Sequence, residues 1–110
     1  MGKKVLIIIS TAEKEKALTG VMYATNALKK KWLEDVKVFF FGPFEKLIAE
    51  DQEIQAMVAP LLEYQTPAAC KFISDRDNVS GSLQTLGYQV SYIGSEISAF
   101  IEDEYIPMVF

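Results

Sequence analysis

The stretch Val5-Leu6-Ile7-Ile8-Ile9 decides the fold of this 110-residue chain. All five residues are apolar and most are β-branched, without the polar alternation of a strand that faces water on one side. Such a run is typical of a central strand in a parallel sheet, because helices cover both faces of that kind of sheet. The sequence therefore predicts an α/β fold with this strand in its interior.

Helix and strand patterns alternate after the first strand. Apolar residues recur every three or four positions over residues 14–33, which predicts an amphipathic helix with Trp32 on its apolar side. A second buried strand is predicted at residues 36–41, and Gly42-Pro43 stops it because neither residue supports a ladder. Two short helices are predicted next, at residues 44–49 and 53–62.

The second half of the chain continues this alternation. Three elements are predicted before residue 94: a strand at residues 66–70, a helix at 79–86 ended by Gly87, and a strand at 89–93. Gly94-Ser95-Glu96 opens a last helix with Ser95 as its predicted cap, and a fifth strand follows at 106–110. Parallel strands need helical crossovers, so we expect a three-layer α/β/α sandwich with a five-stranded, mainly parallel sheet, forming one domain over residues 1–110.

Composition narrows the range of partners and compartments. The formal net charge is -4, whereas a nucleic-acid partner requires a basic face. No apolar stretch approaches the length that spans a bilayer, and only about five apolar residues follow Lys3-Lys4, fewer than a secretory signal core needs. We therefore expect a cytoplasmic protein that binds neither nucleic acid nor membrane. The acidic clusters lack the spacing of a calcium loop, so no metal site is expected.

Cys70 is the single cysteine, and the chain contains no histidine. A Ser-His-Asp triad, a Cys-His pair and a zinc site with Cys or His ligands are therefore excluded within one chain. What remains is thiol chemistry by one sulfur, or no chemistry, since free cysteine is also among the most buried residue types. Cys70 falls at the carboxyl end of the third predicted strand, the edge where parallel sheets collect their ligands and their chemistry.

Two interpretations of the residues after Cys70 remain to be distinguished. If the strand continues through residues 71–73, side-chain alternation buries the sulfur on one face of the sheet. If a helical turn begins at Lys71 and closes at Asn78, the sulfur lies at a helix N-terminus, where unpaired amides and the helix dipole stabilise a thiolate. The polar character of residues 74–78 favours the helical turn.

The charged residues in this turn have opposite effects on the stability of a Cys70 thiolate. Lys71 and Arg76 would add positive charge near the sulfur, while Asp75 and Asp77 would oppose it. We take Lys71, Arg76 and Asn78 as supporting residues of a site centred on Cys70.

The order of these features resembles the DsrE/DsrF-like sulfur-relay family, over nearly the whole chain. The distinguishing element is one cysteine at the end of the third strand, followed about eight residues later by a turn residue and an aliphatic residue, here Asn78-Val79. The other matching features are the strand 5–10, a helix beginning near Glu15, the phenylalanine-rich strand running into Gly42-Pro43-Phe44, Gly87 before Val90, Gly94-Ser95-Glu96, and the closing Pro107-Met108-Val109-Phe110. Asn78 departs from the glycine frequent in the family, and Lys71-Phe72-Ile73 replaces smaller residues or another cysteine.

The resemblance implies sulfur transfer: Cys70 would accept sulfane sulfur as a persulfide from a donor protein and hand it to an acceptor protein, without a cofactor. It also implies a homo-oligomer, a trimer or hexamer. Several aromatic residues are consistent with subunit contacts, namely Phe44, Tyr64, Phe72, Tyr92 and Tyr105.

A function of a different class also fits the sequence. In it, the protein is a non-catalytic binding or scaffold subunit of the same fold, and Cys70 is an inert core residue. A flavodoxin-like flavin or nucleotide binder fits less well, because the loop after the first strand lacks the glycines that let a backbone wrap phosphate.

Overall fold

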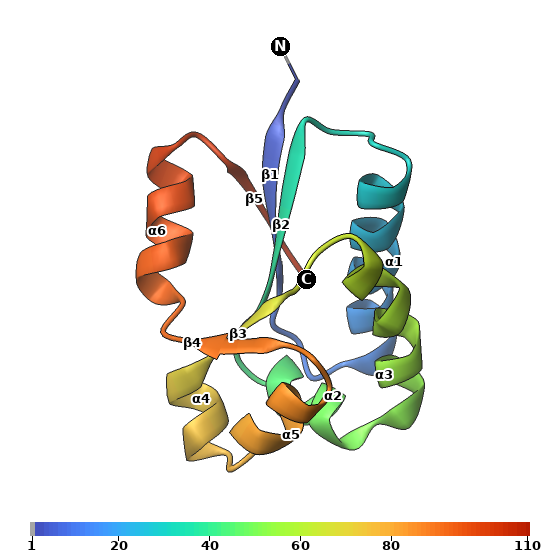
Figure 1. Ribbon diagram of the computed structural model, residues 1–110, viewed down its shortest axis with the longest axis vertical. Helices are drawn as coiled ribbons and strands as arrows, with labels where there is room; N and C mark the ends of the chain where they lie inside the picture. The colour runs from blue at the N-terminus through green and yellow to red at the C-terminus, as the bar shows by residue number, and fades with distance from the viewer. Residues whose placement is uncertain (1) are drawn as a thin grey trace.

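The computed structural model describes residues 2–110, and its centre is a five-stranded sheet. The strands are β1 (Lys4–Ile9), β2 (Asp35–Phe40), β3 (Ala68–Cys70), β4 (Gln89–Ser91) and β5 (Ile106–Val109). They lie in the order β4-β3-β2-β1-β5, and every neighbouring pair is parallel (Figure 1). The predicted α/β fold with a five-stranded parallel sheet is confirmed.

Helices cover both faces of this sheet. The first face packs against α1 (Lys14–Lys29) and α3 (Gln52–Val58), and α6 (Gly94–Glu102) packs on the opposite face (Figure 1). β1 lies between β2 and β5, and its residues Leu6, Ile7 and Ile9 are fully buried. The apolar run of β1 therefore supplies side chains to two separate cores, one on each face.

Three short helices gather at the carboxyl ends of β2 and β3. They are α2 (Phe44–Glu50), α4 (Lys71–Arg76) and α5 (Ser80–Thr85), which lie together at the lower end of the view in Figure 1. A 3-10 helix, η1 (Ala59–Glu63), continues α3. Among residues 2–110, no helix combines the length and the apolar character needed to cross a membrane.

Several predicted boundaries differ from the structure, and the helix predicted at residues 53–62 is divided into α3, which ends at Val58, and η1. α1 ends at Lys29 rather than at residue 33, because Lys31 adopts a left-handed conformation (φ 53°) and turns Trp32 outward, 53% exposed. β3 begins at Ala68 rather than at residue 66, and β4 ends at Ser91 rather than at residue 93.

The predicted cap of α6 is wrong. Ile93 is the N-cap, with φ -87° and ψ -9°, and Ser95 lies inside the first helical turn. The backbone is therefore already helical two residues before Ser95, too early for the hydroxyl of Ser95 to act as the cap.

The aromatic residues expected at subunit contacts fall into two groups. Phe44 is fully buried and packs edge-on against Phe40, and Tyr105 is buried and donates its hydroxyl proton to Asp35. These two aromatic side chains are therefore core residues. Tyr64, Phe72 and Tyr92 are exposed.

Strand β5 forms one edge of the sheet. Phe110, directly after it, donates its amide to the carbonyl of Ile8 at 2.8 Å, so even-numbered amides point toward β1. By alternation, the nitrogen of Pro107 points away from the sheet. Proline is tolerated at that position because it has no N–H to leave unpaired.

Candidate functional site

Cys70 is the last residue of β3 and the N-cap of α4, because Lys71 is already helical. The helical interpretation of this junction is confirmed, and the continuing strand is excluded. The side chain of Cys70 belongs to the apolar cluster under α6, together with Phe39 and Ile93, and the residue is 8% exposed. The thiol thus lies at the carboxyl edge of the sheet but is largely covered.

The turn that follows Cys70 closes in a Schellman motif. Val79 donates its amide to the carbonyl of Ser74 at 2.8 Å, and Asn78 donates to that of Asp75 at 3.2 Å. Asn78 has φ 59°, which confirms its predicted left-handed conformation, and the buried Val79 supplies the accompanying apolar contact. Asn78 therefore ends α4, and its role is conformational.

A small hydroxyl network fixes α4 against α5. Ser74 is fully buried, and its Oγ lies 2.6 Å from Oγ of Ser80 and 3.2 Å from the carbonyl of Lys71. Ser80 in turn donates to the carboxylate of Asp75 at 2.6 Å. Sequence reasoning missed Ser74, because a serine among polar residues carries no local signal of burial.

The two predicted cations take different positions. Nζ of Lys71 lies 2.8 Å from the carboxylate of Asp75, and this hydrogen bond raises the pKa of Lys71. Arg76 pairs with Asp77 at 3.1 Å, and this contact raises the pKa of Arg76, with smaller contributions from the charges of Glu45 and Cys70. Each cation is therefore held by a neighbouring carboxylate, and of the two only Arg76 has Cys70 among the charges that raise its pKa.

Glu45, near the start of α2, is a second residue of interest that sequence reasoning missed. Its side chain is fully buried, and its Oε2 accepts a hydrogen bond from the amide of Gly42 at 3.1 Å. The other oxygen, Oε1, has no hydrogen-bond partner among the described residues. Such an oxygen is unusual, because burial normally forces polar atoms to pair.

Burial is the main influence on the titration of Glu45. It raises the pKa of this carboxyl to about 7, against the opposing effects of the backbone amides of Gly42 and Cys70. The charge of Asp77 adds to the increase, and that of Arg76 opposes it. A carboxyl group that titrates near neutrality therefore lies beside the β3–α4 junction. The position of Glu45, three residues after Gly42, is typical of a side chain that caps the start of a helix. Nothing in the sequence indicates that this side chain is buried.

A shallow hollow of about 320 Å³ adjoins this group of residues. Its lining residues come from the loop after β1, from α2 and from the end of α4: Ala12, Pro43, Lys46, Leu47, Glu50, Arg76 and Asp77. The hollow brings Arg76 next to the surface of α2. It lies at the carboxyl edge of the sheet, the edge that also carries Cys70.

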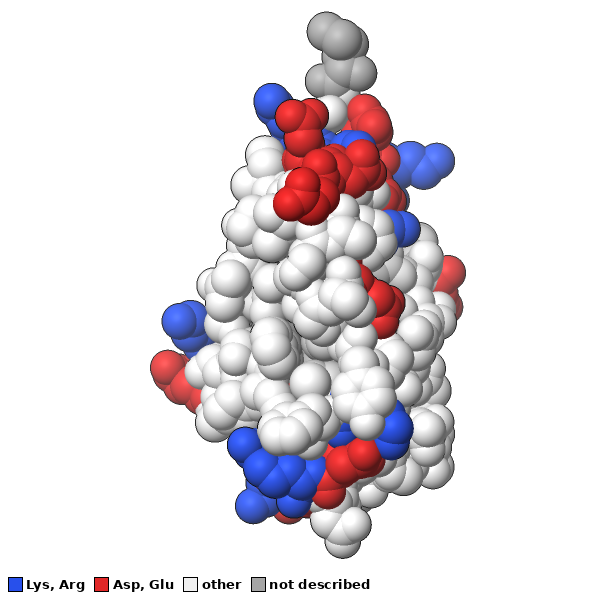
Figure 2. Space-filling view, turned by 90° about the vertical axis from the view of Figure 1, so that its left-hand side faces the viewer, with Lys and Arg blue, Asp and Glu red and all other residues white. Residues whose placement is uncertain are grey.

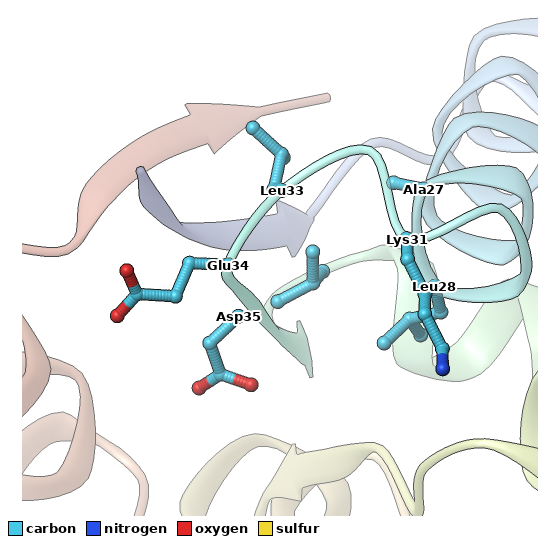
Figure 3. A pocket seen from close by; sticks show the side chains of 7 residues that line it. Ala27, Leu28, Lys31, Leu33, Glu34 and Asp35 are labelled. Carbon is cyan, nitrogen blue, oxygen red and sulfur yellow. The ribbon is translucent and has the colours of Figure 1, made fainter. Parts of the chain in front are cut away.

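A second hollow, of about 340 Å³, lies at the amino ends of the strands, between the end of α1 and the start of β2 (Figure 3). Its apolar part includes Leu28 and Leu33, and the side chain of Lys31 lies far from those of Glu34 and Asp35 in this view. Asp35 already accepts the Tyr105 hydroxyl proton and lies 3.4 Å from Lys37. We therefore centre the candidate site on Cys70 rather than here.

The assembled site contains one thiol, one nearby guanidinium and one buried carboxyl group. The combination suits nucleophilic chemistry by sulfur, because the thiolate is the reactive form and a cation favours it. Within residues 2–110, no three His, Cys, Asp or Glu side chains group in a way that could hold a metal ion.

Comparison with known proteins bears on the fold. No family model matches the sequence, and no curated protein matches it significantly. A structure described as a conserved protein of unknown function, BT1422 from Bacteroides thetaiotaomicron, superimposes with a TM-score of 0.90 at 23% identity, over 98% of this chain and 95% of that chain. The chain thus shares its α/β fold with that protein over nearly the full length of both.

Proposed function

We propose that the protein is a sulfur carrier of the DsrE/DsrF-like kind, in which Cys70 accepts sulfane sulfur as a persulfide and passes it to a partner protein. The observation that carries the proposal is the position of Cys70: its thiol is at the carboxyl end of β3, where α4 begins, and Arg76 is the last residue of the same short helix. A positive charge there favours the thiolate, which is the attacking form.

The transfer needs only thiol exchange. The Cys70 thiolate attacks the terminal sulfur of a donor persulfide, the S–S bond of the donor breaks, and the donor leaves as a thiolate. Cys70 then carries the S–SH group. In the second step, an acceptor thiolate attacks this terminal sulfur, and Cys70 returns to the thiolate form. No electrons are gained or lost overall, so neither step needs an oxidant or a reductant.

The surface around Cys70 suits contact with another protein. Phe72 lies two residues after Cys70, and Tyr92 follows Ser91, the ladder partner of Cys70; these aromatics are 66% and 64% exposed. Figure 2 shows that the middle of the face carrying α6 is mostly uncharged, with a small acidic patch to the right of its centre. Exposed aromatics are enriched at protein interfaces, so this surface supports the proposed contact with a partner protein or with another copy of the chain. The proposed trimer or hexamer follows from the resemblance to the DsrE/DsrF-like family alone.

The proposed chemistry also agrees with a reducing compartment. A single cysteine that carries sulfur must stay free of unwanted disulfides, and cytosolic glutathione and thioredoxin keep thiols reduced. We therefore propose a cytoplasmic location.

A second candidate function rests on the burial of Cys70. The residue packs with Leu6, Phe39 and Ile93 in the apolar cluster under α6. On this alternative, the protein is a binding or scaffold subunit, and its cysteine serves only to fill the core.

Intact-protein mass spectrometry distinguishes the two functions. Wild type and Cys70→Ser are treated with a persulfide donor and then with an acceptor thiol. As a control, the double variant Cys70→Ser with Ser82→Cys presents an exposed thiol on α5. The carrier function predicts that wild type gains one sulfur atom and delivers it, while Cys70→Ser gains none. If folded wild type stays unmodified while the control loads, the scaffold function is supported instead.

A further inference from the structure

We propose that the open edge of β2 is a docking site for an extended peptide segment of another protein, and that the side chain of Gln65 occupies this site in the free protein. The peptide adds to the sheet as a short parallel strand beside the first half of β2. The inference does not involve Cys70, so it is independent of the sulfur-carrier function.

The open edge exists because β3 is shorter than β2. The ladder between these strands pairs only Phe39 and Phe40 of β2 with residues of β3. Among residues 2–110, no strand pairs with the first half of β2 on the side away from β1. An edge of this kind presents main-chain donors and acceptors with which another strand can pair.

The side chain of Gln65 takes the place of a strand residue at this edge. Its Oε1 accepts a hydrogen bond from the amide of Val38 at 2.7 Å, and its Nε2 donates to the carbonyl of Val36. In a parallel ladder, a residue opposite Lys37 makes the same two bonds, since it donates to the residue before its partner and accepts from the residue after it. The amide of Gln65 therefore marks a binding site for a peptide group.

The register of the sheet explains why a side chain fills this position. Continuing the ladder backwards from Ala68, which pairs with Phe39, places Thr66 opposite Lys37. Thr66 is exposed and lies outside β3, so the backbone joins the sheet only after this residue. Gln65 is half-buried, and its side chain can turn toward solvent when a peptide takes its place.

A hollow borders the open edge on each face of the sheet. On the α1 face, the hollow of about 340 Å³ is lined by Leu28 and Val36 and lies between α1 and the start of β2 (Figure 3). On the α6 face, a hollow of about 180 Å³ is lined by Lys37, Gln65 and Phe100. The side chains of a strand alternate between the two faces, so a docked peptide directs them into both hollows. A glutamine that only closed the edge would need neither hollow.

The two hollows determine which peptide fits. The residue opposite Val36 points to the α1 face, where the hollow has its apolar part, so this residue should be apolar. The residue opposite Lys37 points to the α6 face, where Lys37 and Glu96 carry opposite charges, so a neutral polar residue suits this position. The partner is therefore an extended segment of alternating apolar and polar residues. Because its backbone replaces the two bonds of Gln65, burial of its side chains drives the association.

The test is a titration of the nitrogen-15-labelled protein with the peptide acetyl-KVTIT-amide, followed by NMR. The amide resonance of Val38 and the side-chain amide resonances of Gln65 should shift together, because the peptide separates these two groups. The same peptide with both threonine amides N-methylated should leave these resonances unchanged, since it has no donor for the carbonyl of Val36.

Two variants test the role of Gln65. Gln65→Ala should bind the peptide about three- to tenfold more tightly than wild type, because the peptide no longer displaces a hydrogen-bonded amide. Gln55→Ala is the matched control. The side chain of Gln55 also donates to main-chain carbonyls, those of Ile48 and Ala49, but it does so between α2 and α3. This variant should bind the peptide as wild type does.

An unchanged Val38 resonance in wild type at millimolar peptide would overturn the proposal, and so would equal binding of the N-methylated peptide. Equal affinities of wild type and Gln65→Ala would overturn the role given to Gln65. Circular dichroism establishes whether Gln65→Ala folds. If it does not, the titrations of wild type with the two peptides decide the question.

Discussion

The hydroxyl oxygens of Ser74 and Ser80 lie 2.6 Å apart and join α5 to α4, the helix that begins directly after Cys70. We expect Ser74→Ala to lower the free energy of unfolding by about 1–2 kcal/mol, because it removes a buried hydrogen bond and leaves the carbonyl of Lys71 with one donor fewer. Urea denaturation measures the change. Ser82→Ala, at an exposed position of α5, is the matched control and should change stability by less than about 0.5 kcal/mol.

Substitutions at Asn78 test a backbone conformation rather than a side-chain contact. Its φ of 59° suits glycine and asparagine, whereas a β-branched side chain is strained there. Asn78→Val should therefore destabilise the protein by about 1–2 kcal/mol, while Asn78→Gly should be close to neutral. Thermal unfolding of the two variants measures the difference. Equal melting temperatures would contradict a conformational role for Asn78.

The two cations near Cys70 should have unequal effects on its reactivity. A charge on Cys70 is among the influences that raise the pKa of Arg76, whereas the pKa of Lys71 is raised mainly by Asp75. Arg76→Gln should lower the alkylation rate of Cys70 at neutral pH about three- to tenfold, through loss of a charge that favours the thiolate. Lys71→Gln should change that rate less than twofold. Competition labelling with iodoacetamide measures both rates, and a larger effect at Lys71 would contradict this arrangement.

The pH dependence of stability should show the effect of Glu45. Its pKa is about 7 in the folded protein and 4.5 in the unfolded chain, so the folded state binds more protons between these values. The free energy of unfolding therefore falls as pH rises from about 4.5 to about 7, by about 2–3 kcal/mol. Urea denaturation at pH 5, 6, 7 and 8 measures the fall.

The matched variant for this measurement is Glu45→Gln, which has no proton to lose at position 45. Its stability should stay nearly level over the range where that of wild type falls. The carboxyls with lowered pKa values, among them Asp35 and Asp51, lose their contribution only at more acidic pH. A wild-type profile as flat as that of the variant would contradict the raised pKa of Glu45.

Elements set by local chemistry were predictable from the sequence. The apolar run of β1 led to the centre of a parallel sheet, and Asn78 and Gly87 both take the positive φ that ends α4 and α5. In each case the signal lies in a few neighbouring residues. For β1 the signal is burial on both faces, and for Asn78 and Gly87 it is backbone sterics. The local preference agrees with the final fold in each case, so no contact distant in sequence was needed to predict it.

Features set by tertiary packing were not predictable. Ser74 and Glu45 are polar residues without a local signal of burial, and they become fully buried because α2, α4 and α5 meet at the carboxyl ends of the strands. Trp32 shows the opposite error: its spacing matched the apolar side of α1, but the chain had already turned at Lys31. The position of the Cys70 junction was predictable, whereas the carboxyl group beside it was not.

The outward-facing nitrogen of Pro107 determines how this chain can associate with itself. A flat edge strand can act as a template on which another β-strand docks, and repeated docking builds fibrils. Pro107 interrupts that template in the middle of β5, because an incoming strand finds no hydrogen-bond donor there. Growth by adding strands at the β5 edge is therefore blocked, which leaves the side chains of this edge as its means of contact with another copy.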